Sequence, residues 1–128
     1  MRKRVLAVVL MLLSSGALAD EKESGGFVVL ERWKCYPDGY FMREYQYTLL
    51  EKRQAAASEH VYGTVTMRGE FFVSHFEIDG VDRVWDFGEE FEYSFVMKPG
   101  GNAAYYDFRG VEDGEKLPPT QIYRCSQS

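Results

Sequence analysis

The sequence predicts an all-β protein, a single domain of eight antiparallel strands in a meander that closes into a small barrel. Three observations support this fold class. Apolar and polar residues alternate with period two from Phe27 onward, and turn sequences with Gly, Pro or Asp interrupt the alternation at short intervals. Aromatic residues, which fill a small barrel economically, make up 16% of the chain. A β-sandwich built from the same strands is the alternative.

Residues 1–19 have the pattern of a secretory signal peptide. A basic segment at 2–4 precedes an apolar run at 5–12, and Ala17-Leu18-Ala19 supplies a small-x-small cleavage sequence. The apolar run is shorter than the roughly 20 residues that a membrane-spanning helix needs. We therefore expect export to the periplasm or the medium, without membrane insertion.

Removal of this peptide leaves a strongly acidic chain. It takes away three positive charges and no acid, so 12 Lys and Arg remain against 20 Asp and Glu, a formal charge of −8. Residues 20–26 are polar and Gly-rich and predict a flexible leader, and residues 27–128 form the predicted domain. Such a chain is expected to repel nucleic acid and to attract basic partners.

Two cysteines, Cys35 and Cys125, both lie in the exported part of the chain. An even number of cysteines in an oxidising compartment indicates one disulfide. This bridge would tie the first strand to the last, and in the chain-entropy model it would contribute about 4–5 kcal/mol.

The alternating segments define the expected strands in chain order. They are Phe27–Cys35, Tyr40–Leu50, Val61–Met67, Phe71–Ile78, Val81–Phe87, Glu90–Lys98, Ala103–Arg109 and Thr120–Cys125.

Tight turns are expected between most of these strands. The turn sequences are Tyr36-Pro37-Asp38-Gly39, Arg68-Gly69, Asp79-Gly80, Gly88 and Pro99-Gly100-Gly101-Asn102. Two connections are longer. Residues 51–60 have high helix propensity and predict a loop with at most one helical turn, and residues 110–119 predict an irregular acidic loop.

Alternation also predicts which side chains fill the barrel. The expected inner face includes Trp85, Phe91, Phe95, Tyr106 and Phe108. Tyr105 falls on the opposite face, where an exposed aromatic residue would favour a binding surface.

Arg43 and Arg83 each lie between apolar neighbours on the more apolar face of their strands. Alternation points both guanidinium groups into the barrel or toward its mouth. A buried arginine needs a carboxylate, an aromatic face or a bound anion, so both are candidate ligand-binding residues. The alternative is a bulge that turns the residue outward, or a side chain that reaches the rim.

Recognisable catalytic motifs are missing from the sequence. It has no G-x-S-x-G, H-E-x-x-H, P-loop or dinucleotide-binding fingerprint. His60 and His75 are too few for a zinc site once both cysteines are paired, and the acids between 79 and 90 lack the order of a calcium loop. We expect no enzyme activity, no metal and no cofactor. A hydrolase that uses two of the acids is a further alternative.

Trp33-Lys34-Cys35 and Tyr123-Arg124-Cys125 resemble the two ends of the periplasmic and membrane-bound inhibitors of c-type lysozyme. The resemblance implies a small eight-stranded barrel closed by a cysteine pair, with an inhibitory loop late in the chain. The turn at residues 100–105 lies in the place of that loop, but it lacks the Ser and Arg of the family. Trp85-Asp86-Phe87 and the run at 104–108 also resemble small exported bacterial proteins of unassigned function.

Two classes of function follow. The first is a non-catalytic binding protein of the bacterial envelope, in its most concrete form an inhibitor of c-type lysozyme, attracted to that basic enzyme by opposite charge. Its expected contact residues are Gly100, Gly101, Asn102 and Tyr105. The second is a lipocalin-like barrel that binds a small anionic or amphiphilic molecule through Arg43 and Arg83.

We predict that the exported protein begins at Asp20 and carries no free thiol. Intact mass spectrometry should give the mass of the oxidised chain 20–128, and alkylation should add mass only after reduction. A mass that still includes residues 1–19 would contradict cleavage, and alkylation before reduction would contradict the bridge.

Overall fold

The computed structural model describes residues 26–39, 47–112 and 114–128. These residues form eight strands. The strands are β1 (Phe27–Pro37), β2 (Thr48–Ala55), β3 (Val61–Met67), β4 (Glu70–Asp79), β5 (Asp82–Phe87), β6 (Tyr93–Met97), β7 (Asn102–Asp107) and β8 (Gln121–Gln127). The described part of the chain contains no helix, and hence none that could span a membrane.

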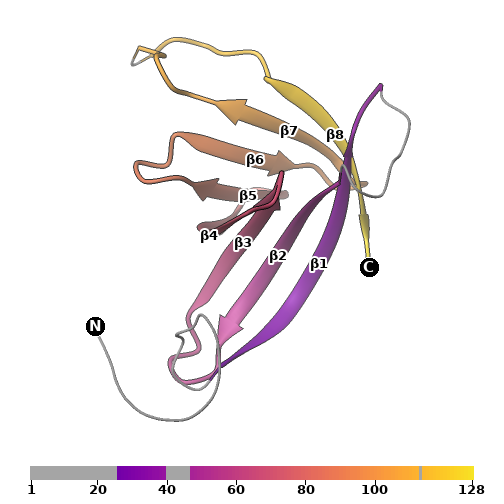
Figure 1. The fold of residues 1–128 in the computed structure, drawn as a ribbon, viewed down its shortest axis with the longest axis vertical. Helices are drawn as coiled ribbons and strands as arrows, with labels where there is room; N and C mark the ends of the chain where they lie inside the picture. Colours follow the sequence, from indigo (N-terminus) through magenta and orange to yellow (C-terminus); the bar gives the residue numbers. More distant parts are fainter. Residues whose placement is uncertain (1–25, 40–46, 113) are drawn as a thin grey trace.

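Each strand pairs with its neighbours in the sequence, and β8 returns to pair with β1, so the sheet is a closed antiparallel barrel (Figure 1). The predicted fold class is therefore confirmed, and the sandwich is not the architecture. A closed meander of this kind leaves few strand edges unpaired.

The seam between β1 and β8 carries the disulfide. Five residue pairs join the two strands, from Trp33 with Gln127 to Pro37 with Tyr123. Cys35 and Cys125 lie opposite each other in the middle of this ladder and are bonded, as the cysteine count predicted. The bridge thus reinforces the ladder that closes the sheet.

A tryptophan organises the inside of the barrel. Trp85 on β5 is fully buried, and its indole Nε1 donates a hydrogen bond of 2.9 Å to the backbone carbonyl of Glu51 on β2, across the interior. The ring lies against Gly63 on β3, where a Cβ atom would collide with the indole and with the Ser74 hydroxyl. Gly63 is therefore needed for space and not for a turn.

The outer face carries one buried carboxylate. Glu51 is 3% exposed and accepts hydrogen bonds from Arg32 at 2.6 Å and from Arg53 at 2.7 Å. Burial acts to raise the pKa of Glu51, but these two hydrogen bonds outweigh it, so the pKa is lowered. The guanidinium of Arg53 also stacks 4.0 Å from the Phe27 ring.

The prediction of a loop at residues 51–60 was wrong for the first half of that segment. Residues 51–55 continue β2, and only residues 56–60 connect it to β3. Residues 51–54 pair with both β1 and β3, so the ladders satisfy their backbone groups and override a helix propensity that is marginal over ten residues. The first half of the predicted strand Tyr40–Leu50 lies outside the described residues.

The predicted inner face was correct for β5 and β6 and reversed for β7. Trp85 and Phe95 are fully buried, whereas Ala103 and Tyr105, not Tyr106, share their face. The reason is the length of the turn. The Lys98 N–H donates to the Asn102 carbonyl, and Met97 pairs with Ala103, so the loop is residues 99–101. This is one residue shorter than the expected Pro99–Asn102 turn. A shift of one residue in register moves every side chain of β7 to the opposite face.

Two of the expected core residues are exposed for local reasons. Phe91 lies before β6 in the turn after Gly88, has a positive φ of 55° and is 57% exposed. Phe108 follows β7, is 38% exposed and stacks on Tyr106 at 5.5 Å on the outside.

We predict that Phe95→Ala lowers the free energy of unfolding by about 3–5 kcal/mol, because it removes a fully buried ring. Phe91→Ala removes the same atoms from an exposed position and should cost about 0.5 kcal/mol or less. Denaturant unfolding of both variants checks this. Equal losses would show that the face of β6 is misassigned.

Candidate functional site

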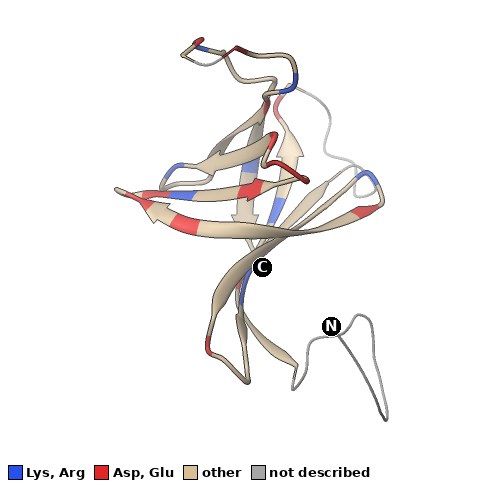
Figure 2. Ribbon diagram, turned by 90° about the vertical axis from the view of Figure 1, so that its left-hand side faces the viewer, with Lys and Arg blue, Asp and Glu red and all other residues tan. Residues whose placement is uncertain are grey.

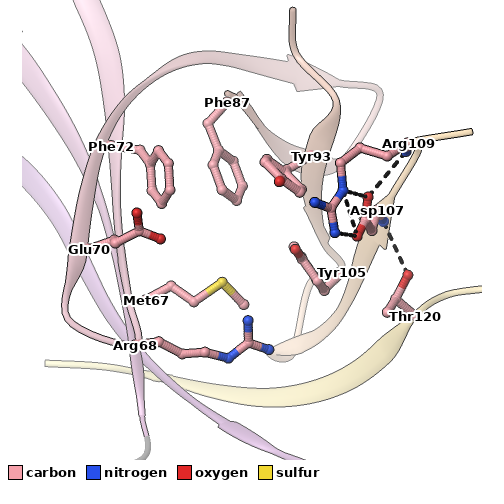
Figure 3. A pocket seen from close by; sticks show the side chains of 10 residues that line it. All are labelled: Met67, Arg68, Glu70, Phe72, Phe87, Tyr93, Tyr105, Asp107, Arg109 and Thr120. Atoms are coloured by element: carbon pink, nitrogen blue, oxygen red, sulfur yellow. Dashed lines mark hydrogen bonds and ion pairs between the residues drawn. The ribbon is translucent and has the colours of Figure 1, made fainter. Parts of the chain in front are cut away.

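The barrel has a pocket at the end where β3 turns into β4, β5 into β6 and β7 into β8 (Figure 3). We call this the mouth pocket, and its volume is about 180 Å³. Its lining residues are Met67, Arg68, Glu70, Phe72, Phe87, Tyr93, Tyr105, Asp107, Arg109 and Thr120.

Rings form the walls of the mouth pocket. Phe72 on β4 contacts Phe87 on β5 with ring centroids 5.0 Å apart, and Phe87 contacts Tyr93 on β6 at 5.4 Å. Tyr105 on β7 continues the series at 6.4 Å from Tyr93. Each ring occupies an inward position near the end of its strand, so alternation on four strands builds one apolar wall.

An ion pair forms one side of the rim. Arg109 donates to both carboxylate oxygens of Asp107, at 2.9 Å and 2.7 Å, and its guanidinium lies 5.4 Å from the Tyr93 ring centroid. The hydrogen bonds from Arg109 lower the pKa of Asp107. The backbone N–H of Asp107 donates to the Thr120 hydroxyl, which ties the β7–β8 connection to the rim. This side of the rim is thus ordered and electrically balanced.

Arg68 supplies the other cation of the pocket. It lies in the turn between β3 and β4 with a positive φ of 51°, and its side chain extends below Met67 and Tyr105 (Figure 3). Within the described ranges, no carboxylate forms an ion pair with it, in contrast to Arg32, Arg53, Arg83 and Arg109. Arg68 is therefore a positive charge that the described fold leaves available.

Burial raises the pKa of Tyr105, and the nearby Asp107 charge acts in the same direction, while Arg68 opposes both. The phenol of Tyr105 is therefore neutral at physiological pH and can donate a hydrogen bond. This places a neutral donor and a cation at the same wall of the pocket.

The structure does not bring the predicted contact residues together around Tyr105. Tyr105 is 6% exposed and lines the mouth pocket, so the expectation that it points outward was wrong. Gly100, Gly101 and Asn102 join β6 to β7 at the opposite end of these strands.

Gly101 has a structural role in that turn. Its carbonyl oxygen accepts a hydrogen bond of 2.8 Å from the Cys125 N–H, and a Cβ at this position would collide with the Cys125 carbonyl oxygen. Gly100 and Asn102 are exposed and remain available for contact.

Arg83 faces the interior, as alternation predicted, near the end of the barrel away from the mouth pocket. It donates to both oxygens of Glu31 on β1, at 2.7 Å and 3.0 Å, and lies 5.4 Å from the Trp33 ring. The hydrogen bond from Arg83 lowers the pKa of Glu31. The positive charge of Arg83 is thus already paired with a carboxylate of the same chain. Arg43, the other candidate, lies outside the described residues.

The side chains described at the pocket indicate which ligands it could hold. Among the described residues, no group of three or more His, Cys, Asp or Glu side chains is placed to hold a metal ion. The mouth pocket offers rings, a neutral phenol and a guanidinium that no described carboxylate pairs with, and together these suit an apolar group with an anionic end.

Comparison of the chain with models of protein families, with curated proteins and with solved structures finds no match.

We predict that Arg83→Ala destabilises the fold by about 1–2 kcal/mol at pH 7, since it leaves Glu31 without its charged partner. The folded pKa of Glu31 is lowered, so this stabilisation is present above the ordinary Glu pKa and is lost as the pH falls through the lowered value. The difference in free energy of unfolding between wild type and variant should therefore shrink below about pH 4.

Denaturant unfolding of both proteins between pH 3 and pH 7 measures this difference in free energy. Lys98→Ala, which breaks the exposed pair with Asp82, is the matched control and should change little. A variant as stable as the wild type at pH 7 would contradict a bracing role for Arg83.

Proposed function

We propose that this protein is an exported, non-catalytic binding protein that holds a small amphiphilic molecule in the mouth pocket. The ligand class is a single apolar ring or branched chain that bears a carboxylate. The observation that carries the proposal is Arg68, which forms no ion pair with any described residue and lies beside an aromatic pocket.

Size and shape support this ligand class. A volume of about 180 Å³ suits one ring, since an apolar cavity of about 150 Å³ accommodates benzene. The rings of Phe72, Phe87 and Tyr93 would contact the apolar part, and Arg68 would pair with the carboxylate.

Glu70 places a second charge on the wall of the pocket. Like Arg68, it forms no ion pair with the part of the chain that is described, and its carboxylate reaches toward the pocket beside Phe72 (Figure 3). An amino group next to the carboxylate of the ligand would therefore also find a partner.

We predict that the protein binds phenylacetate more tightly than phenylacetamide, its uncharged analogue. Arg68→Ala should weaken phenylacetate binding about 10-fold or more and leave phenylacetamide binding unchanged, as expected for loss of one charged hydrogen bond. Isothermal titration calorimetry measures both affinities.

Arg124→Ala removes the same charge from an exposed position on β8 and is the control. Equal affinity for the acid and the amide would contradict the role of Arg68. No binding of either probe would contradict the pocket as a site for this ligand class.

Inhibition of a c-type lysozyme is a second candidate function. It is favoured by the disulfide-closed eight-stranded barrel, which is compatible with the family resemblance, and by the exposed turn at Gly100 and Asn102. The acidic charge of the chain would attract a basic enzyme. Tyr105 has no part in this version of the contact, because it is buried.

We predict, on this second candidate, that the protein slows lysis of cell walls by c-type lysozyme and that salt weakens the effect. Asn102→Lys should reduce inhibition, because it places a positive charge at the contact with a basic enzyme. Pro118→Lys, which makes a similar charge change in the β7–β8 connection, is the control. No inhibition at low salt would reject this candidate.

A further inference from the structure

The second half of β4 has a free edge. β4 pairs with β3 only from Glu70 to Ser74, and from His75 to Asp79 it pairs with β5 alone. On the side that faces β3, residues 75–79 therefore have no strand partner within the described ranges. The β4–β5 hairpin thus extends past its neighbour β3.

The hairpin geometry shows which backbone groups point to this edge. Gly80 and Val81 form a two-residue loop, so Asp79 and Asp82 are the closing pair that exchanges hydrogen bonds. Asp79, Glu77 and His75 then bond to β5, and the residues between them, Phe76 and Ile78, direct their N–H and C=O away from β5. Ile78 is the one of the two that lies further from the last pair with β3. A free N–H and C=O on a strand edge form a template for an added strand.

The side chains on this hairpin alternate between apolar and acidic. Ile78 is 53% exposed and Val81 is 70% exposed, and Glu77 and Asp79 are exposed between and beside them. The excess of acidic residues extends beyond the hairpin, because residues 70–92 contain eight acids and a single arginine. That arginine is already paired with Glu31. Figure 2 shows the acids along the hairpin and at its tip.

We propose that the free edge of β4, from His75 to Asp79, binds a cationic extended polypeptide segment as an added strand. Backbone hydrogen bonds to Ile78 would hold the segment in register. Basic side chains on one face of the segment would lie beside Glu77 and Asp79, and apolar side chains on its other face would cover Ile78. The partner sequence therefore alternates Lys or Arg with apolar residues.

Charge selects this partner over a second copy of the chain. If two copies paired through this edge, Glu77 and Asp79 of each would approach the same acids of the other, which is destabilising. A cationic segment removes that repulsion and gains attraction from the same residues. The edge lies at the far end of β4 from Glu70 and Phe72, so this inference does not depend on the mouth pocket.

The test uses the exported protein and fluorescent peptides in an anisotropy titration. A peptide of four Lys-Val repeats should bind, and a peptide of four Glu-Val repeats should not. The double variant Glu77→Gln, Asp79→Asn should weaken binding of the Lys-Val peptide about 10-fold or more. The control variant Glu112→Gln, Glu115→Gln removes two exposed acids from the β7–β8 connection and should change the affinity less than about 3-fold.

A second peptide separates strand addition from charge attraction alone. The Lys-Val peptide with alternate backbone amides N-methylated keeps its charges but cannot complete a ladder, and it should lose most of its affinity. Equal binding by the methylated peptide, or equal effects of the two double variants, would overturn the proposal. A dimer in light scattering that Glu77→Gln, Asp79→Asn strengthens would show that a second copy occupies the edge, and would also overturn it.

Discussion

Closure of the sheet between β1 and β8 is the constraint on which the rest of the structure depends. Five residue pairs form this seam, and the Cys35–Cys125 bridge lies at its middle pair. A closed sheet lets inward side chains from all eight strands share one core, so Trp85 can bond across the interior to β2. Loss of the seam would open that core to water. The bridge stabilises the seam mainly by restricting the unfolded chain, in which these cysteines are 90 residues apart.

Arginine–carboxylate pairs set the distribution of charge over this frame. Glu51, Glu31 and Asp107 each accept hydrogen bonds from at least one arginine, and each has a lowered pKa as a result. These pairs use most of the arginines of the described residues. The acids between residues 70 and 92 are left in large excess, and Arg68 is left at the mouth pocket. The two proposed binding regions are therefore places where charge compensation within the fold is incomplete.

The candidate site was only partly predictable, because it depends on register. The alternation of β5 and β6 correctly placed Trp85 and Phe95 inside. Tyr105 was misplaced because Pro99-Gly100-Gly101-Asn102 is consistent with more than one turn length, and one residue decides the face of β7. Arg68 carries no signal in the sequence that separates it from any turn arginine. Arg68 matters because it lies beside rings from four strands, β4 to β7, which only the closed barrel brings together.

The sequence by itself determined the all-β class, the order of the strands, the disulfide and the acidic character of the chain. These properties follow from local alternation, from turn chemistry and from counts of residue types, which need no knowledge of long-range contacts. Tertiary structure alone decided that residues 51–55 extend β2, that Glu31 pairs with Arg83, and that β4 leaves β3 after Ser74. Each depends on a partner distant in the sequence, and the energy of that contact overrides the local preference of the chain.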